Sequence, residues 1–233
     1  MYNDIVDIYD EIFPLNRSFL GFIEGFLGEP GSRILDLGCG PGGYVDTIAN
    51  HGYEAVGIDS STEMIKQAQE NCSGSFYPFS FTEIHRLDGQ FDCIFCIGNS
   101  LSYLPNDLLE AFLNDVNGLL MDDGRFLLQV VNWEKFKSIG RSDFPLKTLS
   151  EGRAFHRRYE PGDRGEVIFH TEIRRGDEVL GSWSDPLYPK YADLLVEKVN
   201  GVGLVDPVLF GDFERAPYDP LSSPAIVLSA RKA

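Results

Sequence analysis

Basic residues are scarce in this chain of 233 residues, which has 20 Lys and Arg against 36 Asp and Glu. The resulting net charge of −16 repels nucleic-acid phosphates and anionic lipid, so we expect neither as a partner. No apolar run approaches the roughly 20 residues of a membrane-spanning helix. The acidic first residues also lack the basic start of a secretory signal. These absences favour a cytoplasmic location.

Cysteine is also rare, and four cysteines do not suggest a disulfide framework. Cys93 and Cys96 form a C-x-x-C sequence, which is typical of some redox and metal sites. They lie in the strand-like run 91–97, where side chains three positions apart point to opposite faces. We therefore predict two buried thiols and no metal site.

The most informative stretch is RILDLGCGPGG, residues 33–43. Its apolar beginning predicts a buried parallel strand, and its glycines predict the turn into a helix. Glycines lack a Cβ, so the backbone can approach a ligand closely there. Asp36 stands two positions before the first glycine, at the carboxyl end of the strand. Open α/β sheets bind ligands at that end.

Strand and helix patterns alternate along the first 131 residues and predict an α/β fold with parallel pairing. Strands are expected at 53–59, 75–79, 91–97 and 125–131, with helices at 44–50, 61–72 and 106–120. A helical pattern over 5–27 is interrupted by Pro14. Ahead of the sheet, Tyr2, Tyr9 and Phe13 have two interpretations, a lid over the ligand or packing of a helix face, and packing is favoured.

The pattern changes after residue 133. Residues 140–185 alternate in the manner of strands, and 166–173 with 179–183 predict an antiparallel hairpin or small sheet. A helix is expected at 188–202, and strands at 204–210 and 225–230 close the chain. We therefore predict a ligand-binding domain made of residues 1–133 and 188–233. Residues 134–187 are expected to form a β-rich cap over the substrate pocket.

The glycine turn also matches the dinucleotide fingerprint G-x-G-x-x-G, which by itself is a weak signal. Three features argue against a nicotinamide or flavin site. Asp36 replaces an apolar residue, Pro41 removes an N–H group from the helix start, and helices precede the first strand. A nicotinamide-dependent oxidoreductase remains an alternative.

LDLGCGPGG, GIDSSTEMI and FDCIFCIGNSLSYL, in this order, resemble the motifs of class I S-adenosylmethionine-dependent methyltransferases. The GNSLSYL loop is most similar to the glycine N-methyltransferase-like branch. The resemblance implies a Rossmann-like three-layer sandwich, whose seven-stranded, mostly parallel sheet has its last strand antiparallel. The small antiparallel β insertion is additional. The resemblance also implies S-adenosyl-L-methionine as the cofactor.

The resemblance further implies roles for individual residues. Asp36, Gly38 and Gly40 would line the methionine part and the ribose, with Cys39 in the same turn, and Asp59 would accept hydrogen bonds from both ribose hydroxyls. The other cofactor positions are Ser60 and Met64 beside the adenine, Ile97 along the cofactor, and Ser80 and Phe81 where the family commonly offers the adenine an acid. Tyr103 and Asn99 are the candidate catalytic residues, and Asn99 is expected to face the methyl group or the substrate.

The resulting prediction is an enzyme that methylates a small molecule, with an amine nitrogen as the first candidate, by in-line transfer. Alignment and desolvation would be its main tasks, because the methyl group is already activated. His156 and His170 are interpreted as surface histidines. Arg141, Arg157 and Arg158 either solvate the cap or bind a substrate carboxylate. A cofactor-binding protein without turnover remains a second alternative, and monomer and homodimer are both left open.

Overall fold

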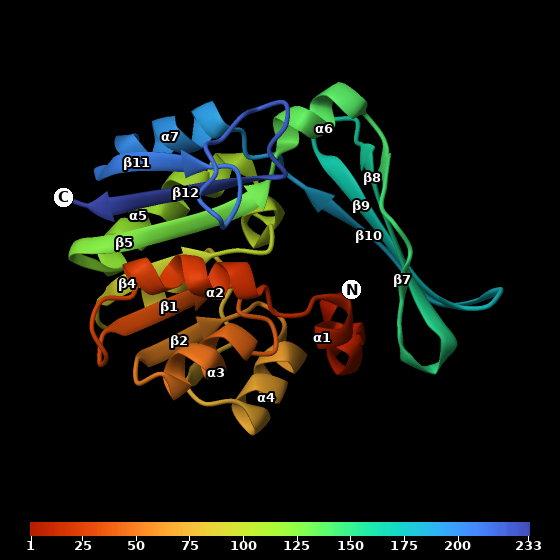
Figure 1. Cartoon of the computed structure of the whole chain (residues 1–233), viewed down its shortest axis with the longest axis horizontal. Helices are drawn as coiled ribbons and strands as arrows, with labels where there is room; N and C mark the ends of the chain where they lie inside the picture. Colours follow the sequence, from red (N-terminus) through yellow and green to blue (C-terminus); the bar gives the residue numbers. More distant parts are fainter.

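The computed structural model describes residues 1–233, except for the side chain of Ser138. A seven-stranded sheet in the order β11-β12-β5-β4-β1-β2-β3 forms its centre (Figure 1). These strands are β1 (Arg33–Leu37), β2 (Glu54–Ile58), β3 (Ser75–Tyr77), β4 (Phe91–Cys96), β5 (Leu120–Val131), β11 (Leu204–Phe210) and β12 (Ala225–Lys232). Only β12 runs against its neighbours, because it pairs antiparallel with both β5 and β11. The predicted sheet, including its antiparallel last strand, is confirmed.

Helices cover both faces of this sheet, so its strands are apolar on both sides, as parallel sheets require. One core contains side chains of α5 (Leu109–Leu119) and α7 (Ala192–Gly201). The opposite core contains side chains of α2 (Arg17–Ile23), α3 (Gly43–Asn50) and α4 (Thr62–Asn71). The molecule therefore has the three layers that the sequence predicts.

The two cysteines of β4 lie on opposite faces of the sheet. Cys93 belongs to the core beneath α2 and α3, and Cys96 to the core beneath α5. Both thiols are fully buried and free, and burial raises their pKa far above the usual value. The prediction of separate buried thiols is confirmed.

The start of β5 differs from the prediction. The strand begins at Leu120 rather than Arg125, since its register against β4 shifts between the pairs Phe91–Leu120 and Cys93–Arg125. This irregularity takes in the turn-like residues 122–124, where Asp123 has a φ of 60°. The acidic, glycine-containing sequence suggests a turn, but Leu120 before it and Arg125 after it both pair with β4, which holds the segment within the sheet.

A second, antiparallel sheet has the order β10-β9-β8-β6, and β7 also pairs with β8. Its strands are β6 (Ser142–Asp143), β7 (Lys147–Thr148), β8 (Arg153–Pro161), β9 (Val167–Arg175) and β10 (Glu178–Leu187). The predicted hairpin corresponds to β9 and β10. β8 lies in the strand-like region but was not predicted as a separate strand, and helix α6 (Trp133–Ile139) was not predicted. Figure 1 shows this sheet standing apart from the central sheet.

The N-terminal segment lies between the two sheets (Figure 1). It consists of 3-10 turns and the short helix α1 (Tyr9–Ile12). Ile5 and Ile12 are buried together with Phe155 and Ile173 of the second sheet and Met64 of α4. The segment therefore joins the second sheet to the central domain. Of the helices described, none is both long and apolar enough to cross a bilayer.

Candidate functional site

A cavity of about 620 Å³ opens at the carboxyl ends of β1, β2 and β4. Its volume is within the range of small-molecule sites. Eleven of the twelve predicted site residues line it: Asp36, Gly38, Cys39, Gly40, Asp59, Ser60, Met64, Ser80, Phe81, Ile97 and Tyr103. Residues that are far apart in the sequence are therefore brought together at one rim of the sheet.

The glycine turn is held against the end of β2. The backbone N–H groups of Gly38 and Cys39 both donate to the carbonyl of Ile58, at 2.8 Å each. Gly40 has a φ of 53°, and a Cβ placed on it would lie 3.3 Å from the ring of Tyr9. The bare backbone at Gly40 thus lets the Tyr9 ring pack directly on the turn, where a side chain would crowd it.

Asp36 is a buried carboxylate without a partner. Its residue is 2% exposed, and neither carboxylate oxygen has a hydrogen-bond partner among the described residues. Burial raises the pKa of Asp36 well above its usual value, and the nearby charge of Asp59 raises it further. Unpaired buried charges are costly, so this carboxylate is suited to receive a cationic or hydrogen-bonding group of a ligand.

Asp59 follows β2, and its carboxylate already accepts hydrogen bonds from backbone N–H groups. Its two oxygens accept hydrogen bonds from the N–H groups of Gly40, at 3.0 Å, and Ser61, at 2.8 Å. Burial raises the pKa of Asp59, although these two hydrogen bonds oppose the shift. The carboxylate fastens the glycine turn to the start of α4, and its remaining lone pairs are available to a ligand.

Ser80 and Phe81 line the cavity after β3. The Ser80 hydroxyl donates to Glu83 at 2.8 Å, and the Ser80 backbone N–H also donates to Glu83, at 3.1 Å. Because both donors of Ser80 are engaged, the apolar ring of Phe81 is the more accessible contact at this place. Phe81 is itself held edge-on against Phe112 of α5, with ring centroids 5.4 Å apart.

Asn99 is the one predicted site residue that does not line the cavity. It adopts a left-handed conformation, with a φ of 66°, in the loop after β4. Its side-chain oxygen accepts hydrogen bonds from the hydroxyl of Ser102, at 2.7 Å, and the backbone N–H of Val131, at 3.0 Å. Asn99 thus braces the loop that carries Tyr103, and its expected contact with the methyl group or substrate stays a prediction.

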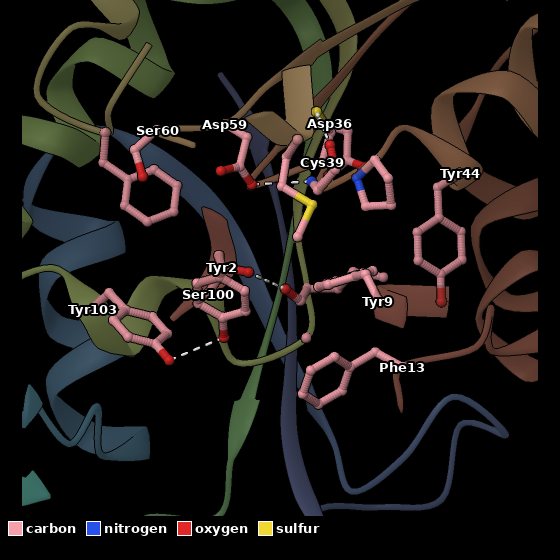
Figure 2. A pocket seen from close by; sticks show the side chains of 18 of the residues that line it. Tyr2, Tyr9, Phe13, Asp36, Cys39, Tyr44, Asp59, Ser60, Ser100 and Tyr103 are labelled. Carbon is pink, nitrogen blue, oxygen red and sulfur yellow. Dashed lines mark hydrogen bonds between the residues drawn. The ribbon is translucent and has the colours of Figure 1, made fainter. Parts of the chain in front are cut away.

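Three N-terminal aromatic residues line the cavity, although the sequence favoured simple helix packing for them. Tyr2, Tyr9 and Phe13 form a wall opposite Asp36 and Asp59 (Figure 2). The hydroxyls of Tyr2 and Tyr103 lie 3.0 Å apart and are hydrogen-bonded. Burial raises the pKa of Tyr2 and Tyr103, so both phenols stay protonated at neutral pH.

None of residues 134–187 lines the cavity, because the N-terminal segment lies between it and the second sheet. Phe155 packs edge-on against Phe13, with centroids 5.9 Å apart, and Trp183 donates to Asp4 at 3.0 Å. The predicted cap is therefore in contact with the aromatic wall rather than with the cavity itself.

The basic residues singled out in the sequence lie elsewhere. Arg141 pairs with Asp143, Arg158 pairs with Glu160, and His170 also pairs with Glu160. Arg157 is half-buried over the ring of Phe144, at 5.0 Å from its centroid. His156 is exposed. In the described part of the chain, no Lys, Arg or His side chain lines the cavity.

Comparisons with known proteins agree with this architecture. Residues 34–124 match the sequence profile of a methyltransferase domain. The protein YqeM of Bacillus subtilis, whose name describes a methyltransferase, is 35% identical over 160 residues, which cover 65% of this chain. The aligned region spans 62% of the length of YqeM.

Two solved structures share the fold over the whole chain. The CcbJ methyltransferase of Streptomyces caelestis has a TM-score of 0.82 at 22% identity, with 100% of this chain and 98% of CcbJ covered. An S-adenosylmethionine-dependent methyltransferase of Clostridium acetobutylicum has a TM-score of 0.80 at 16% identity, with 100% and 99% covered. With the matched domain, this strand order and the carboxylates at the sheet's rim, the chain is similar to class I S-adenosylmethionine-dependent methyltransferases and has their fold.

Proposed function

We propose that this protein transfers a methyl group from S-adenosyl-L-methionine to a small molecule, with an amine nitrogen as the first candidate acceptor. The observation that carries the proposal is that Asp36 and Asp59 line the same cavity, with the bare glycine turn between them. Two carboxylates on separate strands and a backbone without side chains suit a ligand with an ammonium group and a ribose.

The residues of the cavity fit this cofactor. Asp36, which has no partner of its own, would accept hydrogen bonds from the ammonium group of the amino-acid part. Asp59 would accept them from the ribose hydroxyls. Met64 and Phe81 supply apolar contacts of the kind that a flat purine ring prefers. Ile97 and Tyr103 would border the cofactor from the β4 side.

When bound, the cofactor supplies an activated methyl group on a sulfonium. The protein's own contribution is to align the acceptor and to exclude water. The aromatic wall of Tyr2, Tyr9 and Phe13, together with Tyr103, is placed to do both. A general base is required only for a protonated nucleophile, and the absence of basic side chains from the described cavity lining fits a neutral amine.

The two sheets would divide the work. Residues 1–133 and 188–233 would bind the cofactor, and residues 134–187 would shape the acceptor side. This second role is indirect in our proposal, since the second sheet supports the aromatic wall through contacts such as Phe155 with Phe13. A closed wall of this kind favours a small acceptor over a macromolecule.

Calorimetry with S-adenosyl-L-homocysteine, followed by an assay of methyl-donor consumption with amines, alcohols and carboxylates, tests the proposal. We expect binding, and turnover with at least one amine. Asp59→Ala should weaken binding by about 1–3 kcal/mol, through lost charge-assisted hydrogen bonds. Binding without turnover would favour a cofactor-binding regulator. If NADH binds and S-adenosyl-L-homocysteine does not, the protein would be an oxidoreductase instead.

A further inference from the structure

The amino-acid part of the cofactor carries a carboxylate as well as an ammonium group, and the site has no obvious partner for it. Asp10, Asp36 and Asp59 line the cavity, whereas no lysine, arginine or histidine does so in the described structure. A bound carboxylate must therefore be held by neutral donors. This question rests on the proposed function, because it concerns the same cofactor.

We propose that the hydroxyl of Tyr44 donates a hydrogen bond to the carboxylate of the cofactor's amino-acid part. Tyr44 is the second residue of α3, directly after the glycine turn, and it lines the cavity. It is a cofactor-binding residue that the sequence motifs do not single out.

The hydroxyl of Tyr44 has a proton to give. Its oxygen accepts a hydrogen bond from the backbone N–H of Asn16 at 2.8 Å, so one lone pair is occupied. No described group accepts the hydroxyl proton of Tyr44 in return. The ring is fixed edge-on against Phe19, with centroids 5.1 Å apart. A pre-positioned ring with a free O–H loses little entropy when it binds an anion.

The position of Tyr44 also matches the chemistry of the ligand. In an α-amino acid the ammonium and the carboxylate share one carbon, so a partner for the carboxylate must lie close to Asp36. Burial raises the pKa of Tyr44, and Asp36 is the one carboxylate that adds to this shift. Tyr44 and Asp36 line the same cavity, and Tyr44 remains a protonated donor. Figure 2 shows Tyr44 and Ser60 on opposite sides of Asp36 and Asp59.

The other tyrosine hydroxyls of the cavity and the hydroxyl of Ser100 are less suited. The hydroxyls of Tyr2 and Tyr103 share one hydrogen bond, which engages one of their two protons, and the Ser100 hydroxyl donates to the carbonyl of Ile97. The hydroxyl of Tyr9 has no described partner either, but it lies over Gly40, 3.3 Å from a Cβ placed there, where the Gly40 N–H donates to Asp59.

The test compares two ligands that differ in the amino-acid part. S-adenosyl-L-homocysteine contains this part, and 5′-methylthioadenosine lacks it. We expect Tyr44→Phe to weaken binding of S-adenosyl-L-homocysteine about ten- to hundredfold, since one hydrogen bond to a charged group is lost. Binding of 5′-methylthioadenosine should change less than about twofold. Isothermal titration calorimetry measures both affinities.

Tyr53→Phe is the matched control, because it also removes a tyrosine hydroxyl, one that donates to the carbonyl of Gly28 outside the cavity. It should leave both affinities unchanged. Equal losses for the two ligands in Tyr44→Phe, or no loss for either, would overturn the proposal, as would a selective loss in Tyr9→Phe instead. A wild-type protein that binds neither ligand would contradict the proposed function itself.

Discussion

The two sheets of this protein bury their strands differently. β4 is covered on both faces, and five of its six residues are buried. In β9 buried residues alternate with half-buried ones along the strand, with the apolar face toward the N-terminal segment and α6. In a sheet covered on both sides, a charged residue such as Asp36 has no structural reason to be present. In a sheet covered on one side, polar residues occupy every second position whatever the function.

This difference decides where a polar residue indicates function. Asp36 interrupts a two-sided strand and lines the cavity. Arg158 and His170 lie among the less buried positions of the second sheet and pair with Glu160, so they need no ligand. Exposed ion pairs of this kind contribute little to stability, typically less than about 1 kcal/mol.

The largest expected effect comes from truncating one fully buried phenylalanine in each sheet. Phe95 and Phe155 are both 0% exposed. Phe95→Ala should lower the free energy of unfolding by about 3–5 kcal/mol, since a large cavity forms between β4 and α2. Denaturant unfolding measures this loss.

Phe155→Ala should loosen the second sheet and the N-terminal segment, and the central sheet should keep its protection. Hydrogen exchange followed by mass spectrometry separates the two cases, because it reports local opening. Loss of protection throughout the central sheet in Phe155→Ala would show that the two sheets unfold as a single unit, and would remove the distinction between them.

A somewhat smaller effect is expected at Lys190, which joins the two regions. Lys190 lies in the short link between β10 and α7, and its side chain is fully buried. Its ammonium donates to the carbonyls of Leu104, at 2.6 Å, and Tyr188, at 2.9 Å. Burial lowers the pKa of Lys190 to about 7. The unfolded chain therefore binds more protons than the folded one between pH 7 and the ordinary lysine pKa, and stability should rise with pH across this window.

The rise attributable to Lys190 is on the order of 3 kcal/mol between pH 7 and 10, and Lys190→Met should lack it. Urea unfolding at several pH values measures the slope. Lys198, a half-buried lysine of α7 that pairs with Glu110, provides the control, and Lys198→Met should keep the wild-type slope. A Lys190→Met protein with an unchanged slope would contradict the assigned origin of the pH dependence.

The third prediction concerns Asp36, where one substitution should raise stability at higher pH and weaken ligand binding. The pKa of Asp36 is raised in the folded state, so its contribution to stability is complete below the unfolded pKa and is lost as pH rises through the folded pKa. Asp36→Asn should therefore gain stability relative to wild type as pH increases. The same variant should bind S-adenosyl-L-homocysteine about tenfold more weakly.

Calorimetry and urea unfolding at pH 5 and 8 test both halves of this prediction. Glu63→Gln, at an exposed position of α4, serves as the control and should change neither quantity. A stabilised variant with unchanged affinity would mean that Asp36 does not contact the ligand. An unstable variant at pH 8 would show that the carboxylate has a structural partner in solution.

Much of the central domain could be predicted from local sequence patterns. The apolar run before Gly38 is buried as expected, and the side-chain oxygen of Ser61 caps α4 by accepting from Met64 at 3.2 Å. Cys93 and Cys96 point to opposite faces because a strand has a period of two. These features depend on neighbours within a few positions, and a sequence displays such neighbours directly.

The predictions about the site that were incomplete depend on distant contacts. Asn99 carries an amide in a rim loop, which suggests a ligand contact, but its oxygen is taken by Val131, 32 positions away. Tyr2 lines the cavity because it meets Tyr103, 101 positions away. The strand β8 and the helix α6 carry too little regular patterning to stand out from the charged sequence around them.

The sequence by itself determined the order of strands and helices in the central domain, the glycine turn and the two carboxylates at strand ends, because periodicity and backbone freedom are local properties of a chain. Only the tertiary structure decided which polar groups remain without a partner. Asp36 and Asn99 both look functional in the sequence, and packing satisfies the amide oxygen of Asn99 while it leaves the carboxylate of Asp36 alone. The closure of the cavity by the N-terminal aromatic residues was likewise set by contacts across the whole chain.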